Sequence, residues 1–205
     1  MERYAKLTAV YWWYHFKYHV LAALLLFCLM PFLMGTQYLN PEETAKILEY
    51  YAALSGILLL VPIFLPDDDK DIRELLASRR MPMAVNYLSR FSVELFCLFL
   101  FVGGAVLFLK CNGCNFPAGA YFLGTFAEAL FLGGIGLLAY SLSGNGVVGY
   151  MIPMVCYVLN FGGRKYVGNF YLFSMTAGKY GPKYWLAAAG MLAVSLGIGW
   201  RGRRL

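Results

Sequence analysis

The sequence predicts an all-α integral membrane protein with six transmembrane helices, an N-terminal amphipathic interfacial helix and a re-entrant segment before the last helix. Two observations predict this class. The 205 residues are 60% hydrophobic and only 14% charged, and their mean hydropathy is +0.61. A water-soluble domain could not bury so much apolar surface. The charged residues also gather in a few stretches between long apolar runs, so we expect residues 18–205 to form a single six-helix transmembrane domain.

Residues 1–17 are predicted to form the interfacial helix, lying on the cytoplasmic leaflet. Basic residues alternate there with aromatic ones, and this mixture suits the lipid headgroup region. His15 and His19 are four residues apart and could in principle bind a metal. No carboxylate or cysteine lies nearby in the sequence, so we interpret them as interfacial histidines and predict no metal site.

Six apolar segments are expected to cross the membrane, at about 18–34, 41–65, 91–109, 118–141, 147–161 and 184–200. The second has a clear start signal, because Asn40 can cap a helix that begins at Pro41 and carries Glu42 and Glu43 in its first turn. The remaining segment, 162–183, is too long for a turn. Its apolar centre is much shorter than the ~20 residues that a span needs, so we expect a re-entrant or extracellular segment.

The lysines and arginines indicate an orientation. With both termini inside, eleven of the 17 fall on inner segments and six on outer ones. This bias predicts cytoplasmic N- and C-termini; the expected location, a bacterial cytoplasmic membrane, follows from the family resemblance given below. The formal charge of +6 does not indicate nucleic-acid binding, because the basic residues lie beside apolar spans. Four outer charges lie between Arg164 and Lys183; they could contact an anion, but reaching toward lipid headgroups is the favoured interpretation.

The longest charged run is the cytoplasmic loop 66–82, within the stretch PDDDKDIRELLASRRMPMAVNYLSR. Three aspartates after Pro66 suit a helix start, and Arg79 and Arg80 followed by Pro82 suit a helix end. Ile72, Leu75 and Leu76 fall on one face. We expect a short amphipathic helix that a cytoplasmic partner grips; a solvated loop that only sets topology is the alternative.

Catalytic motifs are missing from the sequence. There is no phosphate-binding GxxxxGK[ST] loop, no HExxH and no GxSxG, so we predict no catalytic residues and no cofactor in this chain. Glu94 follows Arg90 by four residues, and we expect a helical ion pair at the interface. Glu128 lies near the middle of a span, where a carboxyl group is costly. A structural hydrogen bond and a role in lining a pathway are equally plausible for it, with Arg164 and Lys165 as speculative companions along a substrate path.

Five cysteines and several glycines complete the picture. Cys111 and Cys114 form a lone CxxC on an outer turn, which supports a small disulfide, free thiols or half a metal site; we favour the disulfide. The other cysteines lie within spans and suit packing. Glycines in the third and fourth spans would allow close helix packing: Gly103, Gly104, Gly124, Gly133, Gly134 and Gly136.

Taken together, this layout resembles the ABC-2 family of permeases, the membrane subunits of type V ATP-binding-cassette exporters. The resemblance covers the topology of the whole chain and, as a motif, residues 66–90. In that family the first cytoplasmic loop forms a coupling helix that docks on the ATPase. The residues that match this pattern here are Asp68, Asp69, Asp71, Ile72, Glu74, Leu75, Leu76, Ser78, Pro82 and Arg90, with Arg79 in the same helix.

The resemblance implies a subunit that works in a larger assembly. A second permease copy, identical or paralogous, and two separate ABC ATPase subunits would join it in the lipid membrane, with ATP and Mg²⁺ bound by the ATPases. The exported substrate would be a peptide, a drug or a lipid-like molecule, for example in export of, or immunity to, a bacteriocin. Two other classes stay open: the substrate-binding membrane subunit of a vitamin or metal importer, and a small membrane enzyme.

Overall fold

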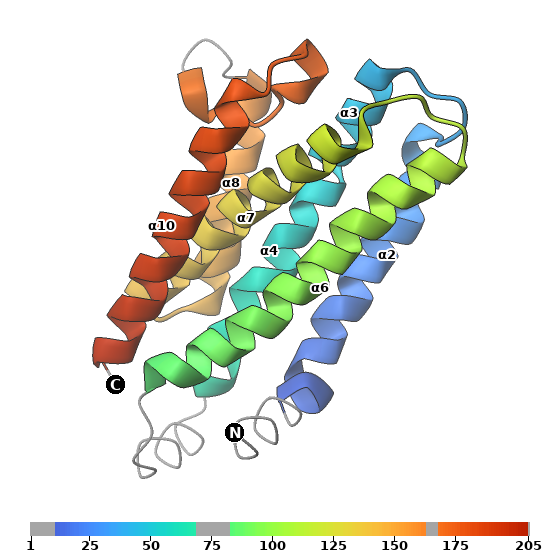
Figure 1. Cartoon of the computed structure of the whole chain (residues 1–205). Coiled ribbons are helices and arrows are strands. Elements are labelled where there is room, and N and C mark those ends of the chain that lie inside the picture. Colours follow the sequence, from blue (N-terminus) through green and yellow to red (C-terminus); the bar gives the residue numbers. More distant parts are fainter. Residues whose placement is uncertain (1–10, 69–82, 163–167, 205) are drawn as a thin grey trace.

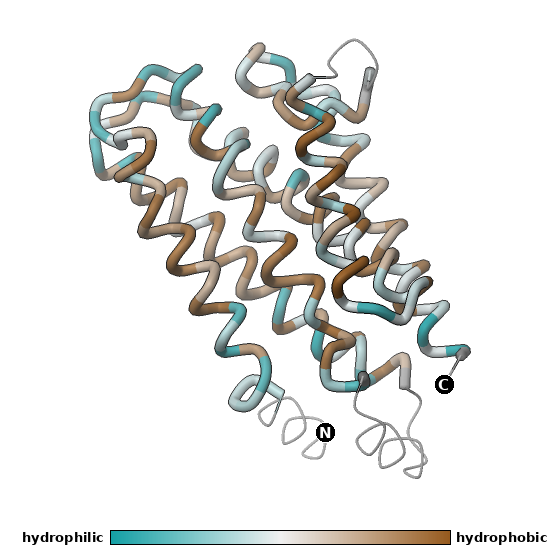
Figure 2. Tube along the Cα trace, turned by 180° about the vertical axis from the view of Figure 1, so that it is seen from behind, coloured by the Kyte–Doolittle hydropathy of each residue, from teal (hydrophilic) through white to brown (hydrophobic). Residues whose placement is uncertain are grey.

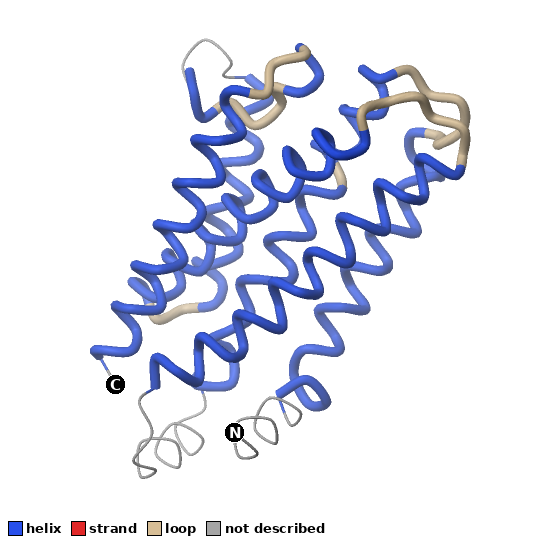
Figure 3. Tube along the Cα trace, in the orientation of Figure 1, coloured by secondary structure: helices blue, strands red, loops and turns tan. Residues whose placement is uncertain are grey.

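A computed structural model describes residues 11–68, 83–162 and 168–204. Figure 3 shows that helices joined by loops make up this part of the chain, with no strand in it. In chain order the helices are η1 (Trp12–Phe16), α2 (Lys17–Met34), α3 (Pro41–Tyr50), η2 (Ala52–Leu54), α4 (Ser55–Leu60), η3 (Val61–Asp68), α6 (Met83–Cys111), α7 (Ala118–Ser143), α8 (Gly146–Gly162), η4 (Gly168–Phe170), η5 (Met175–Ala177) and α10 (Gly181–Arg204).

Four helical runs are long and apolar enough to cross a membrane: Trp12–Met34, Pro41–Asp67, Ala84–Cys111 and Ala118–Ser143. The prediction of a helical protein with membrane-spanning helices is therefore confirmed, with four candidate spans among the described residues where six were predicted. Gly146–Gly162 is a shorter apolar helix, and α10 packs along α7 (Figure 1). Figure 2 shows that hydrophobic residues run through the middle of the bundle and that hydrophilic residues gather toward its two ends.

The helix α7 lies at the centre of the bundle. It packs against α10, α8 and α4, while α2 and α6 lie to one side (Figure 1). In α7, 72% of the most apolar 18-residue stretch is buried inside the protein, and in Pro41–Asp67 the buried share is 78%. The buried share is only 17% in Trp12–Met34 and 33% in Ala84–Cys111. The second and fourth predicted spans therefore form the interior, and the first and third form its margin.

Glycines on α7 let three neighbouring helices approach its backbone. A Cβ atom on Gly133 would lie 2.5 Å from the Gly56 carbonyl oxygen of α4. One on Gly134 would lie 2.7 Å from the Gly190 oxygen of α10, and one on Gly136 2.7 Å from the Gly149 oxygen of α8. The predicted close packing is confirmed for these three glycines, since contact distances this short leave no room for a side chain.

We expect Gly56→Ala to destabilise the protein by about 1–3 kcal/mol, because overpacking a tight helix contact forces the backbone to shift. The added Cβ would lie 1.9 Å from the Ala129 carbonyl oxygen, and a backbone atom cannot turn aside. Thermal unfolding in mild detergent measures the effect. Gly104→Ala is the matched control, because a Cβ there meets nothing within 4 Å in the described part of the chain; equal unfolding temperatures for the two variants would contradict the prediction.

The start of the second span follows its prediction. The α3 helix begins at Pro41, and Asn40 and Glu43 form a reciprocal capping box in which the Asn40 N–H donates to Glu43 Oε2 at 3.2 Å. The span then departs from one uniform helix, since the 3₁₀ segments η2 and η3 flank α4. At the N-terminus, the described part of the predicted interfacial helix runs directly into α2 and is not set apart from the first span.

The ends of the helices divide between the two ends of the bundle. The start of η1, the end of η3, the start of α6 and the end of α10 lie together at one end (Figure 1). The α2–α3 and α6–α7 turns, η4 and η5 lie at the other end. The segments 69–82 and 163–167, which include most of the predicted coupling helix and part of the predicted re-entrant segment, are outside the described residues.

Candidate functional site

Three buried charged side chains meet between α3, α7 and α10, and we call them the lysine cluster: Lys183, Glu49 and Glu128. The Lys183 Nζ lies 2.8 Å from Glu49 Oε1 and 2.9 Å from Glu128 Oε2. It also donates to the Leu172 carbonyl, so all three ammonium hydrogens have acceptors. Lys183 is 5% exposed and both carboxylates are fully buried, which makes this a charged site inside the protein.

The loop before α10 is held over this cluster. Glu49 Oε1 accepts the Met175 N–H at 2.7 Å, and its Oε2 accepts the Thr176 N–H at 3.2 Å and the Thr176 hydroxyl at 2.6 Å. Asn160 Oδ1 on α8 accepts the Leu172 N–H at 3.0 Å. Glu49 therefore accepts four hydrogen bonds, counting the one from Lys183, so both of its buried oxygens have partners within the protein.

Glu128 has fewer partners than Glu49. Its Oε2 accepts from Lys183, while its Oε1 is buried and has no hydrogen-bond partner among the described residues. Two carboxylates therefore share one ammonium group. With all three groups ionised the cluster carries one excess negative charge, and a buried carboxylate oxygen is left able to attract a cation.

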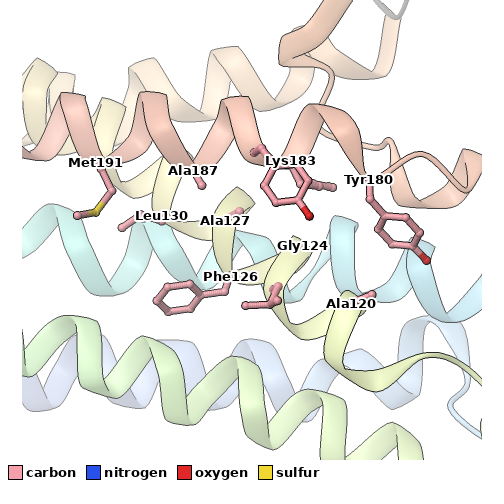
Figure 4. Close-up of a pocket in the computed structure, with 11 residues that line it drawn as sticks. Ala120, Gly124, Phe126, Ala127, Leu130, Tyr180, Lys183, Ala187 and Met191 are labelled. Carbon is pink, nitrogen blue, oxygen red and sulfur yellow. The ribbon is translucent and has the colours of Figure 1, made fainter.

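A groove between α7 and α10 lies beside the cluster, with a volume of about 720 Å³. Figure 4 shows the groove with the residues that line it drawn as sticks. Leu123, Tyr184 and Met191 are more than half exposed, so the groove opens on the flank of the bundle. Among the described residues, Lys183 is the one charged residue in its wall; the others are Ala120, Leu123, Gly124, Phe126, Ala127, Leu130, Tyr180, Tyr184, Ala187 and Met191.

Arg90 forms a second buried charged site at the other end of the bundle. Its Nη1 donates to the Ile63 carbonyl at 3.0 Å and to the Asp67 carboxylate at 3.2 Å. The guanidinium also lies 5.1 Å from the centre of the Tyr11 ring, a cation–π distance. The Tyr11 hydroxyl donates to Glu94 Oε1. These contacts join η3, α6 and the start of the first helical run.

The second site corrects two predictions. Arg90 does not pair with Glu94 four residues later; it pairs with Asp67, 23 residues earlier, because the start of α6 lies against η3. Glu94 is buried and bonded to Tyr11 instead. Asp67 was expected to cap the cytoplasmic helix, but it lies in η3 and is 1% exposed. The backbone before the loop is therefore tied directly to the helix after it.

The lysine cluster corrects a third prediction. We expected Lys183 to reach toward lipid headgroups, but its ammonium group turns inward to two carboxylates. The ion pair of Glu128 with Lys183 is a structural contact, which is the first of the two interpretations of Glu128. The second interpretation, a role in lining a pathway, would act through Lys183, which is in the wall of the neighbouring groove. Glu49 was not predicted at all, although it stands directly before the apolar run of the second span, a position where a carboxylate needs a partner.

Other predicted site residues lie outside the described part of the chain: Asp69, Asp71, Ile72, Glu74, Leu75, Leu76, Arg79, Arg164 and Lys165. Asp68 ends η3, but its side chain also lies outside that part. The structure has Cys111 and Cys114 as free cysteines rather than as the favoured disulfide. Cys111 is exposed, whereas Cys114 is buried with its Sγ 3.4 Å from the Thr36 carbonyl oxygen.

Neither a scan against protein-family models nor searches of curated proteins and of solved structures found a match to this chain. Within the described residues, no group of three or more histidine, cysteine, aspartate or glutamate side chains could hold a metal ion. The sequence motifs and the geometry of the two charged sites are therefore the features that point to a function.

Proposed function

We propose that this chain is the membrane-spanning subunit of an ATP-binding-cassette exporter and that its loop 66–82 couples ATP hydrolysis on a separate ATPase to movement of the bundle. The observation that carries the proposal is the acidic, amphipathic motif of residues 66–90, which resembles the coupling helix of ABC-2 permeases. The link from motif to function is an analogy at the level of the family.

The position of the loop supports this function. It lies between η3 and α6, and η3 ends and α6 begins at the end of the bundle where η1 begins and α10 ends (Figure 1). One face of the protein would then carry the ATPase contact. By the positive-inside bias of the sequence, that face is the cytoplasmic one.

The ion pair between Asp67 and Arg90 supports the coupling role. It joins Asp67, at the start of the loop, to the helix that follows the loop. Arg90 also donates to the Ile63 carbonyl, so η3 and α6 are connected about two helical turns after the loop ends. A movement of the loop driven by the ATPase would therefore shift η3 and α6 together, instead of bending the chain where the loop joins one of them.

Affinity purification of the tagged protein from its native membrane tests the proposal. We expect an ABC ATPase to co-purify in stoichiometric amount and the charge reversal Asp69→Lys/Glu74→Lys to weaken its binding by about 100-fold, since like charges facing each other at an interface cost several kcal/mol. The same variant should uncouple ATP hydrolysis from transport.

Glu42→Lys is the matched control for that experiment. Glu42 is 65% exposed in the first turn of α3, at the opposite end of the bundle from the loop. Its charge reversal should leave the ATPase bound. A protein that purifies alone would contradict the proposal and favour an importer subunit or a membrane enzyme, and ATPase binding that survives the loop variant would contradict the coupling role.

A further inference from the structure

The groove between α7 and α10 and the lysine cluster form one continuous feature. Lys183 belongs to both, since its side chain lines the groove while its ammonium group contacts Glu49 and Glu128. On α7, Gly124 and Ala127 line the groove and Glu128 is the next residue. A molecule in the groove would therefore lie against the helices that carry the excess carboxylate.

The shape of the groove selects for an apolar molecule. Its volume of about 720 Å³ is within the range of sites that hold drug-sized ligands. Aliphatic and aromatic side chains form nearly all of its wall, and half-exposed Leu123 and Met191 at its edge would admit a molecule from the side of the bundle.

The charge behind the wall selects for a cation. One ammonium group faces two carboxylates, and the buried Glu128 Oε1 has no partner in the described part of the chain. Charges interact strongly across a protein interior of low dielectric constant, with little screening by salt. Lys179, which precedes the groove along the chain, is exposed, and water screens its charge.

We propose that the groove binds lipophilic cations, with the apolar body against α7 and α10 and the positive charge balanced by Glu128. This assigns a chemical class of ligand to a site outside the coupling loop. As a statement about what is exported, it rests on the proposed function; as a statement about binding, it concerns this chain alone.

Tetraphenylphosphonium and tetraphenylborate test the proposal, because the two ions have the same shape and opposite charge. Binding is measured by equilibrium dialysis to the purified full chain in phosphatidylcholine nanodiscs, and uptake by empty nanodiscs is subtracted. We expect the protein to prefer the phosphonium by at least about tenfold, the effect of one charge acting over several ångströms at an intermediate dielectric constant. Equal binding of the two ions, or tighter binding of the borate, would overturn the proposal.

Variants separate charge from shape. Glu128→Gln removes the excess charge and should reduce the preference for phosphonium by about tenfold, whereas Glu128→Asp should keep it. Ala187→Phe fills the groove and should reduce the binding of both ions. Glu42→Gln is the matched control, since it neutralises an exposed carboxylate that is not part of the groove wall. A preference that survives Glu128→Gln, or binding that survives Ala187→Phe, would overturn the proposal.

Leu123→Lys keeps the test decisive if Glu128→Gln does not fold. Leu123 is 67% exposed at the edge of the groove, so a lysine there can extend to the interface and add a positive charge without entering the core. It should weaken phosphonium binding by about tenfold, and Leu107→Lys, at a position on α6 that is 66% exposed, should not; equal effects would overturn the proposal. These measurements need no ATPase, so their outcome is independent of the co-purification experiment.

Discussion

Replacing Lys183 by methionine is expected to destabilise the folded protein by about 3–5 kcal/mol, the cost of leaving buried charge without its counter-ion. The methionine would fill much of the same space, so the loss is electrostatic rather than a cavity. Glu49 would keep its bonds to Met175 and Thr176, but Glu128 would lose the one partner it has among the described residues. The unfolding temperature in detergent reports the change.

Two further variants interpret that result. Lys179→Met removes an exposed lysine from the same segment and should change stability by less than about 0.5 kcal/mol. The double variant Lys183→Met/Glu128→Gln removes the excess charge together with its partner and should recover part of the loss, which a double-mutant cycle measures. If Lys183→Met unfolds at the temperature of the native protein, the ion pairs do not stabilise the bundle.

Arg90→Met is expected to cost a similar amount, about 3–5 kcal/mol, because Asp67 would remain buried without its cation. Asp67 is 1% exposed, and the Ile63 carbonyl would lose its donor as well. If the ion pair couples the loop to α6, the variant should also reduce ATP-driven transport more than its stability loss explains. Transport measured below the unfolding temperature separates the two effects.

Arg203→Met provides the control at the same end of the bundle, because Arg203 is exposed near the end of α10. Adding Asp67→Asn to Arg90→Met should restore part of the stability and none of the coupling. The two charged sites lie toward opposite ends of the bundle (Figure 1), so the losses from Arg90→Met and Lys183→Met should add. A coupling defect equal to that of Arg203→Met would exclude a role for the ion pair in transmission.

The helices were predictable because their signals are local. Asn40, Pro41 and Glu43 stand within one turn of each other, so the sequence alone placed the start of α3. Runs of apolar residues likewise indicated the four helical runs that are long enough to span a membrane. Glycines on α7 indicated close packing without any knowledge of which helix lay opposite.

The charged sites were not predictable because their partners are distant in the sequence. Lys46 pairs with Glu42 four residues earlier, at 3.2 Å, which is the local arrangement that helix geometry suggests. Arg90 and Glu94 have the same spacing, yet each bonds to a residue on another element. The partner of each charged side chain depends on which faces of the helices meet in the fold, and the spacing of residues along the sequence does not show this.

The lysine cluster is also assembled in a fixed order during synthesis of the protein. Lys183 lies 134 residues after Glu49 and 55 after Glu128, so a ribosome delivers both carboxylates well before their counter-ion. A nascent chain that stops short of α10 carries two acidic groups that must stay in contact with water or take up protons. The lysine cluster is therefore complete only after α10 has been made and has packed against α7.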